Sequence, residues 1–447
     1  MTKPDNPNKT RFGFETRMIH AGAAPEPVTG ARQTPIYQNT SYVFHDADHA
    51  ASLFNLQSFG FIYSRLANPT VAVLEERLAS LENGRGATCC ASGHAAQILT
   101  FFAFMEPGDE FVASNKLYGG SLTQFGKTFK KFDWHAHLVD TDDLAAVRAA
   151  ITPKCKALFV ESLANPGGVV SDLEPLAEIA HQAGLVFIVD NTLATPYLCQ
   201  PFDWGADLIV HSTTKFLSGN GTSMGGAVID SGTFDWGQND KFGGLTAPEP
   251  AYHGLTFYET FGDLAFTTLS HMVGLRDLGA TMAPMNAFQT LLGIETLSLR
   301  MERHCANAQD VAEFLAGHEL VAWVSYAGLE SDPYHGRAQK YLGGRAGSVF
   351  TFGVKGGGVT GGYEMGMRVV ESCELFSHLA NVGDARSLIL HPASTIHRQL
   401  TDEQRDTAGA GPDVVRLSIG LETLDDLLAD LDQALHRAAA EDDKAAE

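Results

Sequence analysis

The chain has 447 residues, of which 44% are hydrophobic and 19% charged, an ordinary composition for a globular protein. Its 53 acidic residues outnumber the 31 basic ones, and the resulting net charge of −22 disfavours nucleic acid and anionic membrane surfaces as partners. The apolar runs are too short to span a bilayer and the polar start MTKPDNPNKT has no apolar signal core, so we expect a cytoplasmic protein.

Residues 1–70 contain scattered Pro, Gly, Asn and Thr with little periodicity, which predicts an extended arm with short helical pieces. From Pro69 onward, segments with helical spacing alternate with short apolar runs. Helices are predicted over 71–82, 94–105, 121–132, 142–151 and 172–184, the last with Asp172 as N-cap and Gly184 beyond its end. Strands are predicted over 87–92, 110–114, 135–139, 156–162, 185–190, 206–212 and 225–230.

Apolar, β-branched strands that alternate with helices indicate a mainly parallel sheet covered on both faces, which is a three-layer α/β domain. A segment from Thr233 to Phe266, rich in Gly, Pro and aromatic residues, interrupts this order before a linking helix predicted over Gly274–Arg303. Beyond it, shorter strands (348–354, 387–391, 414–420) and helices (364–376, 424–440) predict a smaller α+β domain. We therefore divide the chain into an arm (1–70), an α/β domain (71–300) and a C-terminal domain (301–447).

The most informative stretch runs from Asp190 to Lys215. Asp190 closes the predicted strand 185–190, and Lys215 comes just after the predicted strand 206–212, both at the carboxyl ends where α/β proteins form their ligand crevice. Alone, a carboxylate and a lysine could form only a salt bridge at the sheet edge. Ser92-Gly93-His94 lies at another strand-to-helix junction, where backbone N–H groups can hold a phosphate, and Ser212 and Thr214 add hydroxyl donors.

A lysine amine, a buried carboxylate and a phosphate cradle together suggest pyridoxal phosphate. The aldehyde of this cofactor needs a lysine for a Schiff base, its pyridine nitrogen needs an acidic partner, and its phosphate needs anchors.

Six motifs make the sequence recognisable: YSRLANPT (63–70), ASGHAA (91–96), ESLANPGG (161–168), VDNT (189–192), HSTTKFLSG (211–219) and VVRLSIGLE (414–422). In this order and spacing they resemble the pyridoxal-phosphate-dependent transsulfuration enzymes of cysteine and methionine metabolism, from about Thr16 to Leu435. The resemblance implies the type I fold of these transferases, which is aspartate aminotransferase-like, with a seven-stranded sheet in the larger domain.

The resemblance also implies roles for individual residues. Lys215 would carry the cofactor and move protons between substrate carbons, Asp190 would pair with the pyridinium nitrogen, and Tyr118 would stack on the cofactor ring; these three are the predicted catalytic residues. Asn165 would bind the phenolic oxygen, and Arg416 would clamp the substrate carboxylate, with Asn381 and Tyr63 also predicted to contact substrate. The remaining predicted cofactor-binding residues are Ser92, Gly93, His94, Thr192, Ser212 and Thr214.

The resemblance implies that Tyr63 and Arg65 contact the phosphate in the adjacent subunit, so the N-terminal arm would contribute to the neighbouring active site. The resemblance therefore implies a homotetramer built from dimers that share active sites.

Two departures favour one branch of the family. Asn381-Val382 stands where related enzymes more often have Ser-Leu, and Gly120 stands where methionine γ-lyases carry a cysteine. With the inserted segment Thr233–Phe266, these features resemble the O-acetylhomoserine sulfhydrylases, whose substrates are O-acetyl-L-homoserine and sulfide or methanethiol. Methionine γ-lyase and cystathionine γ-synthase, from the same family, are the alternatives.

Other patterns in the sequence do not support a different function. Gly356-x-Gly358-x-x-Gly361 resembles a dinucleotide fingerprint of a nucleotide-binding oxidoreductase, but no complete βαβ unit surrounds it. Gly126-Lys127-Thr128 resembles the end of a P-loop only by coincidence. A non-enzymatic sheet protein would leave Asp190, Lys215 and Arg416 without a common purpose.

No metal site is predicted either. His135/His137 and His391/His397 have suitable spacing, but the sequence gives no sign that a carboxylate or thiol converges on them. The six cysteines include no C-x-x-C pair and are expected to be buried free thiols.

Overall fold

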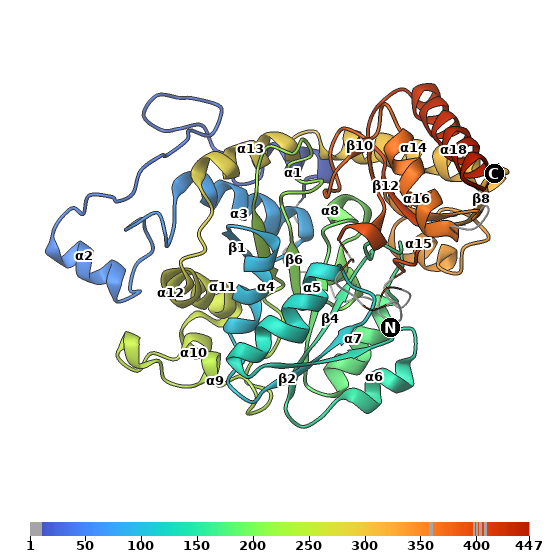
Figure 1. Cartoon of the computed structure of the whole chain (residues 1–447). Coiled ribbons are helices and arrows are strands. Elements are labelled where there is room, and N and C mark those ends of the chain that lie inside the picture. The colour runs from blue at the N-terminus through green and yellow to red at the C-terminus, as the bar shows by residue number, and fades with distance from the viewer. Residues whose placement is uncertain are drawn as a thin grey trace.

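The computed structural model describes residues 11–356, 361–396, 398, 401, 405 and 409–446, and its centre is a seven-stranded sheet (Figure 1). The strand order is β1-β7-β6-β5-β4-β2-β3, and all neighbours are parallel except β7, which runs antiparallel to β1 and β6. This confirms the predicted mainly parallel sheet. The strands are β1 Gly86–Cys90, β2 Glu110–Ser114, β3 His135–Val139, β4 Cys155–Glu161, β5 Val186–Asp190, β6 Leu208–His211 and β7 Gly226–Asp230.

Both faces of this sheet are buried, because alternate residues of each strand enter two different apolar clusters. On β5, Phe187 and Val189 belong to one cluster and Val186 and Ile188 to the other. Helices cover the faces, as expected for three layers. They are α3 Pro69–Glu82, α4 Gly93–Phe102, α5 Gly119–Thr123, α6 Leu144–Ala150, α7 Leu173–Gln182 and α8 Thr195–Leu198, with a π-helix at Gln124–Thr128 and a 3-10 helix at Phe129–Phe132.

A second, five-stranded sheet forms the smaller C-terminal α+β region, as predicted. Its order is β10-β11-β12-β9-β8. The strands are β8 Val321–Ser325, β9 Val349–Val354, β10 Ser377–His378, β11 Leu388–Leu390 and β12 Val414–Ser418, and the helices are α14 Leu297–Gly317, α15 His335–Tyr341, α16 Gly361–Ser372 and α18 Leu424–Ala446. The edge strands β8 and β10 were not predicted from the sequence, since β8 is half exposed and β10 is only two residues long.

The connection between the two regions differs from the single linking helix expected over Gly274–Arg303. The chain instead forms a π-helix (Ser270–Leu275), α12 Arg276–Leu278, α13 Pro284–Ile294 and α14. Gly279, at a φ of 70°, ends the first helical stretch, and Pro284 begins the next.

The inserted segment 233–266 is not a loose loop. It contains α9 Gly243–Thr246, α10 Phe257–Phe261 and the start of α11 Ala265–Leu269. Its aromatic residues Phe234, Trp236, Phe242 and Phe257 are buried in the apolar cluster on one face of the sheet. The aromatic composition that marked this segment as an interruption is therefore what attaches it to the core.

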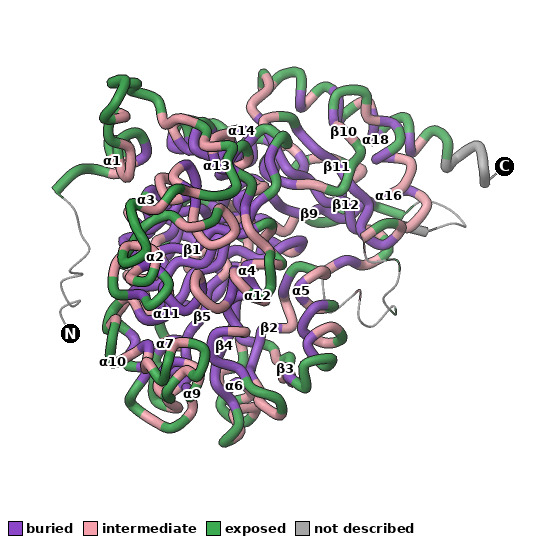
Figure 2. Tube along the Cα trace, turned by 90° about the vertical axis from the view of Figure 1, so that its left-hand side faces the viewer, coloured by how far each residue is buried: buried purple, intermediate pink, exposed green. Residues whose placement is uncertain are grey.

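The N-terminal arm contains α1 Phe14–His20 and α2 Ala47–Phe54, and the part around α2 extends away from the body (Figure 1). Figure 2 shows exposed residues along this part. Several of them are apolar: Val28 is 87% exposed, Val43 96% and Phe59 71%. Such a surface is typical of a segment that packs against another molecule.

Within the described residues, no helix has the length and apolar character needed to cross a membrane.

Candidate functional site

A cavity of about 350 Å³ opens where β4, β5 and β6 end and α4 begins, and residues of the second sheet region close it. Its lining includes most of the predicted site residues: Ser92, Gly93, His94, Tyr118, Asn165, Asp190, Thr192, Ser212, Thr214, Lys215, Asn381 and Arg416. This is the position at which open α/β sheets bind ligands.

The beginning of α4 forms one wall. Ser92 is its N-cap, and its side-chain oxygen accepts a hydrogen bond from the Ala95 N–H at 3.1 Å. A Cβ at Gly93 would lie 2.7 Å from the Cβ of Ser212, so only glycine allows the helix to approach so closely. The first N–H groups of this ten-residue helix have no intrahelical partners, which suits an anion.

Hydroxyl groups from the loop after β6 lie beside this helix. The Ser212 N–H donates to Oγ1 of Thr192 at 2.8 Å, and the Thr192 N–H donates to Oδ1 of Asp190 at 3.0 Å. The Thr214 hydroxyl donates to the Gly225 carbonyl and accepts from the Gly225 N–H. Thr214 therefore also fixes the loop, and Ser212 has the freer hydroxyl.

Two carboxylates share the floor of the cavity. Asp190 ends β5, and Glu161 is its register partner at the end of β4. Glu161 accepts hydrogen bonds from the backbone N–H groups of Tyr118 (2.7 Å) and Asn165 (3.2 Å). Burial raises the pKa of Glu161 and the charge of Asp190 raises it further; burial also raises the pKa of Asp190.

Sequence reasoning missed Glu161, although it opens the motif ESLANPGG. The available signal was the same one that identified Asp190, an acidic residue as the last residue of a buried parallel strand. Gln97, Met224 and Ile396 also line the cavity and were not predicted.

Lys215 extends into the cavity from the loop after β6. Burial lowers its pKa to about 8, and the nearby Arg416 charge acts in the same direction. Its Nζ donates to Oδ1 of Asn381 at 2.6 Å. An amine with a pKa near neutrality, held by an amide rather than a carboxylate, is suited to act as a nucleophile.

Arg416 projects from β12 of the second sheet and is only 4% exposed. Its guanidinium donates to Oδ1 of Asn165 at 3.3 Å and to the Asn381 carbonyl at 3.0 Å. Among the described residues, no acidic side chain forms an ion pair with it. Burial lowers its pKa to about 10, so it remains charged at neutral pH and can bind an anion.

Tyr118 and His94 stack at the mouth of the cavity, with ring centroids 5.9 Å apart and an interplanar angle of 27°. A Cβ at Gly120 would lie 2.4 Å from Cε1 of Tyr118 and 2.8 Å from Cε1 of His94. Glycine at this position, one of the departures noted in the sequence, is therefore needed for the observed stack.

Tyr63 and Arg65 are not among the residues that line the cavity. Arg65 donates to the Arg276 carbonyl, its guanidinium lies 5.7 Å from the Tyr63 ring centroid, and Tyr63 is 43% exposed. A single chain thus does not bring these two residues to the cavity.

The residues present fit pyridoxal phosphate. The Lys215 amine, which is buried and has a lowered pKa, can react with the aldehyde. The buried carboxylate of Asp190 can pair with the pyridine nitrogen. The start of α4 at Gly93, together with the Ser212 hydroxyl, can bind the phosphate.

The described residues of the other sequence patterns do not line the cavity. Gly126-Lys127-Thr128 belongs to the π-helix, and His391 Nε2 bonds to the Pro412 carbonyl at 2.8 Å. Gly358 and His397 lie outside the described residues.

Comparison with known proteins points to one family. The family model described as Cys/Met metabolism PLP-dependent enzyme matches residues 15–436. An O-acetyl-L-homoserine sulfhydrylase of Leptospira meyeri is 47% identical over 95% of this chain and 97% of its own length. O-acetyl-L-homoserine sulfhydrylase 1 of Thermus thermophilus is 48% identical over 94% of this chain and 99% of its own.

A solved structure of a similar protein points to the same family. A Campylobacter jejuni protein assigned as an O-acetylhomoserine (thiol)-lyase, crystallised with a pyridoxyl-lysine monophosphate, superposes with a TM-score of 0.92. The two sequences are 42% identical, and the match covers 95% of this chain and all of that one (100%).

Proposed function

The chain belongs to the Cys/Met metabolism family of pyridoxal-phosphate-dependent enzymes, and from this membership we propose that it is an O-acetyl-L-homoserine sulfhydrylase. It would replace the acetate on the γ-carbon by sulfide or methanethiol and release homocysteine or methionine. The enzyme is thus a transferase of methionine biosynthesis.

One observation carries the choice of substrates: Arg416 is the only arginine among the described residues that line the cavity. It serves the carboxylate of the amino-acid substrate. Sulfide and methanethiol need no charged partner of their own. Cysteine, the thiol of a cystathionine γ-synthase, would have to desolvate a second carboxylate without a second guanidinium from this chain.

When bound, pyridoxal phosphate supplies an electron sink that stabilises negative charge on the substrate carbons. The start of α4 and the Ser212 hydroxyl would hold the phosphate, and Asp190 would keep a proton on the pyridine nitrogen. Tyr118 would cover the ring, and Asn165 would position the phenolic oxygen. Such contacts would hold the scissile bonds in a fixed orientation.

Lys215 and Arg416 act on the substrate itself. The guanidinium of Arg416 binds the carboxylate and so places the α-carbon within reach of Lys215 Nζ. The Lys215 amine removes the α-proton and then shuttles protons at the neighbouring carbon as acetate leaves, which its pKa of about 8 favours. Asn381, which holds Lys215 Nζ and accepts from Arg416, links these two functions.

We further propose a homotetramer built from dimers, in which Tyr63 and Arg65 complete the neighbouring subunit's site. The exposed apolar residues of the arm and the position of Tyr63 and Arg65 outside the chain's own cavity support this assembly. In this proposal the arm (1–70), cofactor domain (71–300) and substrate domain (301–447) have separate tasks. A cytoplasmic location is supported by six free cysteines, none of which forms a disulfide.

The substrate proposal is tested by steady-state kinetics with O-acetyl- and O-succinylhomoserine, each combined with sulfide, methanethiol and cysteine. We expect the highest kcat/KM for the acetyl ester with sulfide or methanethiol, and only slow γ-elimination of methionine. If succinylhomoserine with cysteine is the best pair, the enzyme is a cystathionine γ-synthase; if methionine cleavage dominates, it is a methionine γ-lyase.

Shared sites are tested by mixing an Arg65→Ala protein with a Lys215→Ala protein. Hybrid dimers contain one intact site, so refolded mixtures should regain activity that neither parent has. Inactive mixtures in which hybrids demonstrably form would rule out the contribution from the partner.

A further inference from the structure

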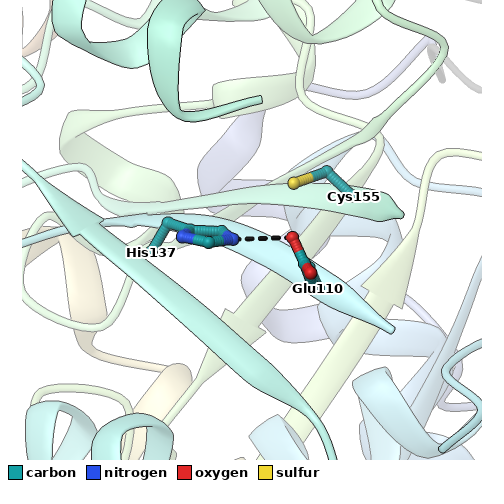
Figure 3. Close-up of side chains that lie close together, drawn as sticks. All are labelled: Glu110, His137 and Cys155. Atoms are coloured by element: carbon teal, nitrogen blue, oxygen red, sulfur yellow. Dashed lines mark hydrogen bonds and ion pairs between the residues drawn. The ribbon is translucent and has the colours of Figure 1, made fainter. Parts of the chain in front are cut away.

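Three metal-ligating side chains converge near the amino ends of β2, β3 and β4, in the same sheet as the cavity but at the opposite ends of the strands (Figure 3). Glu110 opens β2 and is the register partner of Cys155, which opens β4; His137 on β3 is the partner of Val112. Register partners and alternate residues share one face, so all three side chains lie on the same side of the sheet. Their ligand atoms are all within 4.8 Å of one another.

The sequence alone gives no sign that a carboxylate or a thiol lies near His137. The tertiary structure brings both. His137 Nε2 lies 2.7 Å from Oε2 of Glu110, and the Cys155 thiol is buried beside them.

We propose that Glu110, His137 and Cys155 bind one divalent zinc ion, with water as the fourth ligand. A mixed oxygen, nitrogen and sulfur set suits zinc better than magnesium or calcium. Tetrahedral zinc bonds of about 2.0–2.3 Å place ligand atoms roughly 3.3–3.6 Å apart. His137 Nε2 and Glu110 Oε2 are 2.7 Å apart, and no two of the three ligand atoms are more than 4.8 Å apart, so small side-chain movements bring them to zinc-binding distances.

Charge and proton balance also permit the ion. Without metal, Nε2–H of His137 donates to Oε2 of Glu110. When zinc binds, the thiol proton passes to solvent and the imidazole proton moves to Nδ1, which no described residue binds, so Nε2 can coordinate. A thiolate and a carboxylate then neutralise the two positive charges. The Thr152 hydroxyl donates to Oε2 of Glu110 at 2.6 Å and orients the carboxylate, and His137, 37% exposed, provides access.

A second cluster, His318, Asp432 and His436, has similar spacing but different hydrogen bonding. The Leu320 N–H donates to Nδ1 of His318 at 3.2 Å, so the proton must reside on Nε2, the nitrogen that faces Asp432. A metal at Nε2 would have to displace that proton without another place for it on the ring. This cluster therefore serves as a negative control.

Equilibrium dialysis of the holoenzyme against zinc, with elemental analysis, tests the site. We expect one ion per chain at low micromolar zinc, and at least a tenfold weaker affinity in His137→Gln, Glu110→Gln and Cys155→Ser. The matched controls are His135→Gln, on the same strand but paired with Asp133, and His436→Gln; both should retain the ion. All variants should keep full activity, which also shows that they fold.

Cobalt gives a second readout that does not depend on affinity alone. Cobalt added to the holoenzyme should produce a thiolate-to-metal absorption band, seen as a difference spectrum, that Cys155→Ser removes and Cys89→Ser keeps. The proposal is overturned if the wild-type protein retains no zinc, if the ligand variants bind as tightly as the wild type, or if the cobalt band survives in Cys155→Ser.

Discussion

Buried charges at the amino ends of the central sheet differ in their partners from the two cations in the cavity at its carboxyl ends. At the amino ends, Lys156 pairs with Asp109 at 2.6 Å and His181 with Asp207 at 3.0 Å. In the cavity, Lys215 donates to an amide oxygen and Arg416 to two carbonyl oxygens.

The absence of a counter-ion for these two cations, among the described residues, indicates a binding site for anionic ligands. Burying a charge without a counter-ion costs free energy, which the amino ends avoid by pairing within the chain. At the carboxyl ends the cofactor phosphate and the substrate carboxylate would supply the missing negative charges. The shifted pKa values of Lys215, Arg416 and Glu161 follow from this arrangement.

The largest effect is expected from Lys215→Ala, which removes the only lysine among the described residues that line the cavity. The purified protein should lose the visible absorbance of the cofactor–lysine bond and essentially all turnover. Absorption spectra and assays measure both, and wild-type activity in this variant would contradict the assignment of Lys215.

Asp190→Asn should keep the fold and lower kcat by roughly 100-fold or more, since an amide cannot hold the proton on the pyridine nitrogen. Circular dichroism checks the fold and steady-state kinetics the rate. A near-normal rate would mean that the neighbouring Glu161 can replace Asp190.

Arg416→Lys tests whether this guanidinium, which has no acidic partner among the described residues, is a carboxylate clamp. A lysine keeps the charge but loses the planar fork, so we expect kcat/KM for O-acetylhomoserine to fall about 10- to 100-fold, mainly through KM. The affinity for sulfide should stay unchanged, and an equal loss for both substrates would indicate a structural role.

Glu161→Gln should change how the stability of the fold depends on pH. The native state raises the pKa of Glu161 above its unfolded value of 4.5, so this residue favours folding at low pH and loses that contribution as pH rises through the folded pKa. Relative to the wild type, the glutamine variant should therefore gain stability from about pH 5 to about pH 9. Urea unfolding at several pH values measures the difference in the free energy of unfolding between the variant and the wild type. A difference that does not change with pH would contradict the raised pKa of Glu161.

The smallest effect is expected for the His181–Asp207 pair at the amino end of the sheet. The hydrogen bond to Asp207 raises the pKa of His181, so the pair stabilises the fold below about pH 6.5 and less as pH rises further. Because His181 is 44% exposed, His181→Gln should cost only about 0.5 kcal/mol at acidic pH and less at alkaline pH. The same unfolding experiment on His135→Gln, whose partner Asp133 is 63% exposed, is the control.

Periodicity predicted most of the fold. The strands at 110–114 and 135–139 have the predicted bounds, because each is a short apolar run between clear breaks. Asp172 was expected to cap α7 and stands at that position, but its carboxylate accepts from the Tyr341 hydroxyl instead. A partner 169 residues away competes with a local cap, and no local pattern reveals it.

The sequence by itself determined which groups stand at the end of each strand, since parallel strands joined by helices place their carboxyl ends at one edge. Asp190, Lys215 and the start of α4 could be placed together for that reason. Only the tertiary structure decided that Glu161 lies beside Asp190, that Arg416 crosses from a second sheet to face Lys215, and that Cys155 and Glu110 meet His137. These contacts join residues far apart in the chain, and their distances depend on register and packing between strands, which no single segment encodes.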